Sequence, residues 1–295
     1  MSRNTFKTYV LLAALGGFLV LIGSFFGRGG AFLGLGLGLV FVGGSYWFSD
    51  TIAIKAARAV PVTEQEMPEY YAIVRELADR SGMPMPRLYV TPDMQPNAFA
   101  TGRSPERAAV AVTQGVLQIL DRDELRGVLA HELSHVANRD ILIGSVAAAV
   151  AMGITFIARM AMWGAMFGGF GGSSSDDEDR GGNIFGLLAM AVLAPIAAML
   201  MQMALSRSRE HEADRSGARL IGDGEPLARA LEKLEVTARR VPMNIDPAHA
   251  QAFIVNPLTG RRIQFSSLWR SHPPTQDRVA RLRGRDWASA GGNRL

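Results

Sequence analysis

Four apolar segments of this chain approach the roughly 20 residues that a helix needs to cross the hydrocarbon core of a bilayer. They cover residues 9–26, 31–48, 141–158 and 184–205. In the second segment, Gly34 and Gly38 follow Gly30 at the four-residue spacing that lets helices approach closely in lipid. The pattern predicts an integral membrane protein with about four transmembrane helices.

Two details of these segments leave alternatives. Arg159 directly follows the third segment. Either its side chain reaches the outer interface beside Trp163, or the third and fourth segments form a partly inserted hairpin. The glycines of the second segment also resemble a phosphate-binding loop, but no predicted strand precedes them, so a nucleotide site is not expected.

The two remaining regions, 49–140 and 206–295, are too polar to span a membrane and together are long enough for one compact domain. Residues 63–79 have the pattern of an amphipathic helix with Thr63 as N-cap, and another helix is predicted to begin after Asp121. Short runs typical of strands lie at 87–90, 98–101 and 108–112, and further helices are predicted at 225–236 and 276–283. The predicted fold class is α+β, mostly helical.

The alternation of apolar and polar regions divides the chain into four parts. Residues 1–50 form a two-span membrane anchor, and 51–140 form the first part of a cytoplasmic domain. Residues 141–205 form a membrane hairpin with an acidic outer loop, and 206–295 complete the cytoplasmic domain.

The placement of charge predicts the orientation in the membrane. Basic residues flank the spans on one side, at Arg3, Lys7, Lys55, Arg58, Arg139, Arg207 and Arg209. The other side receives only Arg28 and an acidic loop at 172–179 followed by Arg180. The positive-inside rule therefore predicts that both termini and the polar domain are cytoplasmic. The formal net charge of +4 then reflects this topology, so we expect lipid and not nucleic acid as a partner. The arginines between residues 278 and 285 either touch anionic lipid or form a solvated helix face.

Candidate chemistry comes from the histidines, because the chain has no cysteine. The lack of cysteine excludes disulfides, thiolate metal sites and thiol nucleophiles. On the helix predicted after Asp121, His131 and His135 are four residues apart and share one face, so both imidazoles can reach one metal ion. Glu132 lies beside them, where it can approach a water at an open position of a zinc site. The alternative is a pair of surface histidines on a polar helix face.

A third ligand is expected just after the fourth apolar segment. Glu210 and Asp214 share a face of a predicted helix, which suits a carboxylate ligand and a second acid that orients a ligating histidine. His211 and Glu212 point elsewhere on such a helix and are interpreted as surface residues. An even number of membrane crossings separates His135 from Glu210, so the two half-sites would meet on the same side of the membrane.

With these motifs the chain resembles the HtpX-type membrane metalloproteases, a gluzincin-like group related to the CAAX prenyl proteases. The resemblance rests on His131-Glu132-Leu133-Ser134-His135, on Arg209-Glu210 with Ala213-Asp214, on residues 96–102, and on Ser271-His272-Pro273-Pro274-Thr275 with Arg278. It covers nearly the whole chain and the order of the four hydrophobic segments.

The resemblance implies a zinc-dependent endopeptidase of the bacterial inner membrane that cleaves misfolded or damaged membrane proteins at the cytoplasmic face. His131, His135 and Glu210 would bind one zinc ion, and Glu132 would act as general base. Asp214 would orient a zinc-bound histidine.

Two further assignments concern the substrate. Asn97, Phe99 and Ala100 belong to a segment that is either an edge strand along which an extended peptide adds, or an ordinary short strand. His272 either stabilises the transition state or caps the turn that follows it. Unfolded or membrane-embedded polypeptides are the expected substrates.

Three other classes of protein fit the sequence less well. A proteolytically silent, zinc-stabilised membrane adaptor would have no need of Glu132. A prenyl-protein protease would usually have more spans than this chain. A transporter is disfavoured because, apart from Arg159 and Gln202, the spans carry almost no polar groups near the midplane.

Overall fold

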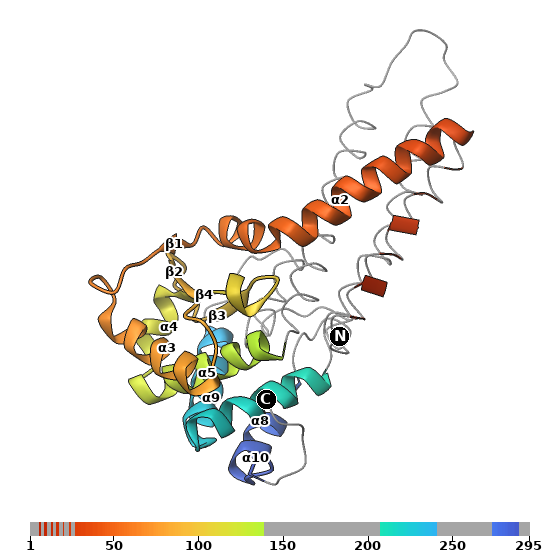
Figure 1. Cartoon of the computed structure of the whole chain (residues 1–295). Helices are drawn as coiled ribbons and strands as arrows, with labels where there is room; N and C mark the ends of the chain where they lie inside the picture. Colours follow the sequence, from red (N-terminus) through yellow and green to blue (C-terminus); the bar gives the residue numbers. More distant parts are fainter. Residues whose placement is uncertain are drawn as a thin grey trace, which may run out of the picture.

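The structure is a computed structural model that describes residues 27–138, 207–240 and 273–288, with scattered positions between 6 and 24. The described helices are α2 (Gly27–Ala56), α3 (Pro68–Ser81), α4 (Gln114–Ile119), α5 (Arg122–Ala137), α8 (Arg207–Ile221), α9 (Glu225–Arg240) and α10 (Thr275–Arg283). The strands are β1 (Val60–Pro61), β2 (Arg87–Thr91), β3 (Ala98–Thr101) and β4 (Ala109–Thr113), and a 3-10 turn, η1, covers Pro105–Arg107. Figure 1 shows α2 extending away from the body formed by the other described elements.

The four strands form one mixed sheet in the order β1-β2-β4-β3. β2 and β4 are parallel, with Leu88 opposite Val110, while β3 is antiparallel to β4, with Ala98 opposite Val112. β1 is antiparallel to β2. β3 is therefore an edge strand within the described sheet.

The two faces of the sheet follow the two-residue alternation of a strand. Leu88, Ala98, Val110 and Val112 belong to the main core, whereas Phe99 packs with Ala109 and Ala111 against Ile54 near the end of α2. In β4 every side chain is buried, which is typical of a strand covered on both faces.

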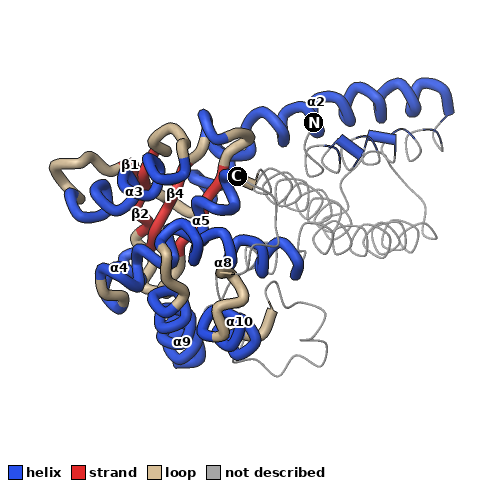
Figure 2. The backbone as a smooth tube through the Cα atoms, turned by 60° about the horizontal axis from the view of Figure 1, so that its bottom comes forward, coloured by secondary structure: helices blue, strands red, loops and turns tan. Residues whose placement is uncertain are grey.

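α5 lies at the centre of the domain. It contacts α3 and β3 on the sheet side and α8 and α9 on the other, and α10 packs on α8 and α9. Figures 1 and 2 agree that α5 lies between the sheet and the pair α9 and α10. Val128, Leu129 and Leu133 are almost fully buried, and each such side chain contributes about 1.5–3 kcal/mol by leaving water.

The start of α5 is fixed by its own sequence. The Asp121 side chain accepts a hydrogen bond from the Glu124 backbone N–H at 2.9 Å, and the Glu124 carboxylate accepts one from the Asp121 N–H at 3.0 Å. This reciprocal capping box satisfies two N–H groups that a helix start leaves without partners. Glu124 is also buried against Lys233 of α9 at 2.6 Å, so the cap joins the two helices.

The predicted start of the helix at 63–79 is wrong, because its N-cap is Met67 and not Thr63, a difference of four residues. Thr63 and Glu66 do exchange hydrogen bonds, but they close a turn, and α3 begins at Pro68. Proline at the first helical position has a helical φ and needs no N–H partner, which explains the later start. The predicted strand 98–101 agrees with β3, and 87–90 and 108–112 lie within one residue of β2 and β4.

Several expected features of the membrane part fall on residues that the structure does not describe. These are most of the segment 9–26, the segments 141–158 and 184–205, and the acidic loop between them. The segment 31–48 forms part of α2. Within the described ranges, none of the helices has the length and apolarity that crossing a membrane requires.

Candidate metal centre

Three potential metal ligands converge where α5 meets α8. His131 and His135 lie one turn apart on α5, and their Nε2 atoms are 3.1 Å apart. Glu210, in the first turn of α8, has carboxylate oxygens 3.6 Å from His131 Nε2 and 3.6 Å from His135 Nε2. One donor atom from each residue lies within 4.8 Å of the others.

The two 3.6 Å distances from Glu210 fit a tetrahedral zinc site, and the 3.1 Å between the two histidine nitrogens is slightly shorter than that geometry requires. Zinc lies about 2.0–2.2 Å from nitrogen and oxygen ligands, so two donors of a tetrahedron are about 3.3–3.6 Å apart. The donor set also suits the ion, since two imidazoles and one carboxylate leave a fourth position for water or substrate. The residues present therefore fit a catalytic zinc ion.

Asp214 determines which nitrogen of His131 faces this cluster. Its Oδ1 lies 2.9 Å from His131 Nδ1, and both side chains are buried. When Nδ1 donates its hydrogen to the carboxylate, the Nε2 lone pair is directed at His135 and Glu210. Glu210 and Asp214 reach α5 together because they are four residues apart on α8.

A buried cation completes the arrangement. Arg278 of α10 donates from Nε to Asp214 Oδ2 at 2.9 Å and from Nη2 to Oδ1 at 2.7 Å. Burial alone would raise the pKa of Asp214, but the guanidinium of Arg278 and the hydrogen bond with His131 outweigh it and hold that pKa well below its ordinary value. Burial lowers the pKa of His131 and outweighs Asp214, which acts in the opposite direction. The lowered pKa favours the neutral imidazole that a metal needs.

Glu132 lies beside the three donors and contacts the sheet. Its Oε2 accepts a hydrogen bond from the backbone N–H of Ala100 at 3.0 Å. Burial raises the pKa of Glu132 to about 7, with His135 acting in the opposite direction and Glu210 in the same one. A carboxyl group with a pKa near neutrality is suited to accept and return a proton.

The predicted substrate-binding residues lie on or next to β3. Asn97 is buried, and its carbonyl accepts a hydrogen bond from the Thr113 N–H at 2.9 Å. Phe99 is turned to the α2 side of the sheet, whereas Ala100 packs against the main core and directs its N–H to Glu132. His272 lies outside the described residues.

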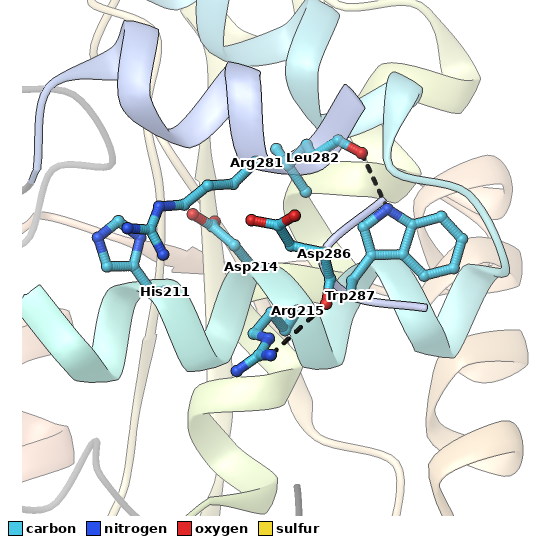
Figure 3. Close-up of a pocket in the computed structure, with 7 residues that line it drawn as sticks. All are labelled: His211, Asp214, Arg215, Arg281, Leu282, Asp286 and Trp287. Atoms are coloured by element: carbon cyan, nitrogen blue, oxygen red, sulfur yellow. Dashed lines mark hydrogen bonds between the residues drawn. The ribbon is translucent and has the colours of Figure 1, made fainter. Parts of the chain in front are cut away.

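The structure also places the two neighbours of Glu210 that were interpreted as surface residues. Glu212 is half-exposed and lies 3.9 Å from Arg215. His211 lines a pocket of about 180 Å³ together with Asp214, Arg215, Arg281 and Trp287 (Figure 3). Neither belongs to the cluster of three donors.

Two residues beside the centre were given no role by the sequence. Arg278 was noted only as part of a motif, and the arginine-rich segment was expected on a lipid or solvent-facing surface, yet Arg278 is 1% exposed. Gly217 lets α8 approach α5, since a Cβ there would lie 2.9 Å from the backbone N of His131. The spacing of Gly217, three residues after Asp214 and seven after Glu210, is the signal that could have revealed it, because all three share one helix face.

Comparison with known proteins identifies a matching family and similar chains. The family model described as "Peptidase family M48" matches residues 64–286. Proteins named "Protease HtpX homolog" are 52% identical in Syntrophobacter fumaroxidans, over 95% of this chain and 99% of the relative, and 51% identical in Thermococcus kodakarensis, over 94% of each. A crystal structure of Ste24p from S. mikatae aligns with a TM-score of 0.51 at 20% identity, covering 94% of this chain and 64% of that one.

The fold, the donor set and these relatives together define a metallopeptidase. At 20% identity, the alignment with Ste24p shows a shared fold and nothing about activity. The chain belongs to peptidase family M48.

Proposed function

We propose that the protein is a zinc-dependent endopeptidase that cleaves misfolded or damaged membrane proteins at the cytoplasmic face of a bacterial inner membrane. The observation that carries the proposal is the convergence of His131, His135 and Glu210 beside the buried carboxylate of Glu132. A site that only stabilised the fold would have no use for Glu132, so a silent zinc-stabilised adaptor is disfavoured.

The proposed ligands of the zinc ion are His131, His135 and Glu210, with Asp214 orienting His131. The ion would supply Lewis acidity, which polarises a carbonyl group and lowers the pKa of a water. The side chains of this chain supply the rest. Asp214 accepts the Nδ1 hydrogen of His131, and the neutral histidine offers Nε2.

Glu132 is the proposed general base. Its carboxylate accepts the proton of the attacking water and delivers it to the leaving amine. The hydrogen bond from Ala100 N–H fixes one oxygen of Glu132, which leaves the other free to take part in proton transfer. His272 remains a candidate for stabilising the charge that develops on the carbonyl oxygen.

The outer edge of β3, which is an edge strand of the described sheet, is the proposed binding site for the substrate backbone. Because Asn97 bonds to β4, the outward backbone groups of the strand belong to Ala98 and Ala100, and of these the Ala100 N–H is already donated to Glu132. An extended peptide that pairs there would run past Glu132 and the three donors. Main-chain pairing gives affinity with little sequence selectivity, which suits unfolded substrates.

Membrane association is proposed from the four apolar segments and from the surface of α2. Large apolar side chains of α2 are exposed, among them Phe32 (74%), Leu39 (68%) and Val40 (74%). Exposed apolar side chains along one helix are stable in lipid and costly in water. The proposed organisation is an anchor at 1–50, a hairpin at 141–205 and a cytoplasmic protease built from 51–140 and 206–295.

Cleavage of an unfolded reporter by the detergent-solubilised full chain tests the activity. Cleavage should require zinc, and Glu132→Gln should keep the bound zinc while losing about 10²–10⁴-fold in rate, the contribution of a general base. Glu212→Gln is the matched control, because this half-exposed carboxylate of α8 lies outside the cluster. A silent adaptor would bind one zinc per chain without cleaving, and near-normal turnover by Glu132→Gln would exclude the assigned base.

Cysteine labelling in intact cells tests the orientation. The chain has no cysteine of its own, so Ser174→Cys in the acidic loop creates a single target. An impermeant thiol reagent added outside the inner membrane should label it before lysis. Labelling only after lysis would contradict the proposed topology.

A further inference from the structure

Arg278 is the largest fully buried side chain among the described residues, although it is an arginine on a helix otherwise rich in exposed charge. Arginine is rarely buried unless it is paired. Its guanidinium points away from solvent and holds both oxygens of Asp214, in a fork with distances of 2.9 and 2.7 Å. Nη2 of the same guanidinium lies 3.5 Å from His131 Nδ1.

This fork restricts how Asp214 can bond to His131. A guanidinium has donors only, so both carboxylate oxygens act as acceptors toward Arg278. Oδ1 also contacts His131 Nδ1 at 2.9 Å, and the hydrogen of that contact must come from the imidazole. His131 is then the Nδ1–H tautomer, whose free lone pair is on Nε2, the atom nearest His135 and Glu210.

We infer that Arg278 is a positioning residue of the metal centre, which acts through Asp214 to hold His131 in the tautomer and orientation that offer Nε2 to the ion. The inference rests on the proposed function, since it concerns the same zinc site. It also makes docking of α10 a condition for a complete site, because α10 supplies Arg278 while α5 and α8 supply the ligands.

A purely structural role for Arg278 would be to attach α10 to the domain. That task is already shared by other residues of the helix: Val279 and Leu282 are buried, and Arg283 pairs with Glu225 at 2.9 Å and Glu232 at 2.8 Å on α9. The remaining arginine of the helix, Arg281, is exposed and lines the pocket that Asp214 also lines (Figure 3). Among these residues of α10, Arg278 is the one that forms hydrogen bonds and an ion pair with Asp214 in the described part of the chain.

Arg283 therefore provides the matched control. It lies on the same helix and makes a double fork of its own, but it contacts no residue of the metal centre. Methionine and lysine variants are made at both positions. Methionine removes the charge, whereas lysine keeps it but cannot bridge two carboxylate oxygens in the planar geometry of a guanidinium.

The first readout is the tautomer of His131 in metal-free protein labelled with ¹⁵N-histidine, with the His131 signals assigned by their loss in His131→Gln. We expect the Nδ1–H form in the wild type and in both Arg283 variants. Arg278→Met should give a mixture of tautomers. An unchanged Nδ1–H signal in Arg278→Met would overturn the inference, whether or not the protein proves to be a peptidase.

The second readout is the affinity of the full chain for Zn²⁺, measured by competition with a chromophoric chelator. Arg278→Met should lower it by about 10-fold or more, as outer-shell substitutions do, and Arg278→Lys by less. The Arg283 variants should stay within about twofold of the wild type. Arg278 variants that match the corresponding Arg283 variants would overturn the inference. If Arg278→Met does not fold, the two lysine variants decide.

A double-mutant cycle tests whether Arg278 acts through Asp214. In the background of Asp214→Asn, the further change Arg278→Met should cost no additional zinc affinity, because its target is already lost. Losses that add would show that Arg278 acts by another route and would overturn the inference. Failure of the wild type to bind zinc would instead contradict the proposed function and leave the tautomer measurement to decide on Arg278.

Discussion

The close approach of α8 to α5 at Gly217 can be tested by adding a single methyl group. A Cβ at this position would lie 2.9 Å from His131 N, 3.1 Å from Ala130 C and 3.1 Å from His131 Cα. All three atoms belong to the backbone of α5, so no side chain can move aside. Gly217→Ala therefore requires the two helices to separate.

The size of the effect follows from these contacts. Non-bonded carbon atoms are ordinarily about 3.5–4.0 Å apart, so relief requires a displacement of about 0.5–1 Å. Overpacking of this kind costs about 1–3 kcal/mol, and each kcal/mol lowers the melting temperature of a domain this large by about 2–4 °C. The shift would also move Glu210 relative to His131 and His135 by more than the roughly 0.2 Å that metal–ligand distances tolerate.

Thermal unfolding and Zn²⁺ affinity should be measured on the same preparations. We expect Gly217→Ala to lower both the melting temperature and, by at least about 10-fold, the zinc affinity of the folded protein. Gly127→Ala is the matched control. Its Cβ would lie 2.6 Å from Leu227 N, where α5 contacts α9, and α9 carries none of the three donors. It should destabilise the protein with little change in zinc affinity.

Two results would refute this reasoning. Unchanged stability in Gly217→Ala would show that the helices are not in close contact at this point. Equal losses of zinc affinity in Gly217→Ala and Gly127→Ala would show that general destabilisation, and not the separation of α8 from α5, weakens the site.

Three further predictions concern single residues. Glu210→Gln should lower the zinc content of the purified protein, measured by elemental analysis, because a neutral amide is a poor ligand. Unchanged zinc content would show that another residue is the third ligand. Asp121→Ala should lower the free energy of unfolding by about 1 kcal/mol, whereas Asp121→Asn should keep the cap. Because the Glu124 N–H lowers the pKa of Asp121 in the folded state, the part of the advantage over Asp121→Ala that depends on the carboxylate charge should be complete above the unfolded pKa of about 4. It should be lost as pH falls through the lower folded pKa, which pH-dependent unfolding would detect. Ala100→Pro should lower kcat/KM by about 10-fold or more relative to Ala100→Gly, because proline removes the N–H that contacts Glu132, and equal values would argue against that contact.

Local elements of the domain were predictable because their signals are local. The capping box of α5 depends on residues three apart, and the predicted strand 98–101 agrees with β3 because short-range alternation and turn residues bound it. The start of α3 was mispredicted because the Thr63–Glu66 pattern can close a turn as well as begin a helix. β1 and α4 were missed, since two and six residues are too few to give a periodic signal.

The sequence by itself determined the pairing of His131 with His135 and of Glu210 with Asp214, because helical periodicity alone places residues four apart on one face. It could not determine that these two faces meet, since 74 residues separate His135 from Glu210 and no local rule relates them. The two faces are brought together only in the tertiary structure, where α8 packs on α5 at Gly217. The tertiary structure also decided the environment of Arg278, because the burial of a charge depends on what packs around it and not on its neighbours in the chain.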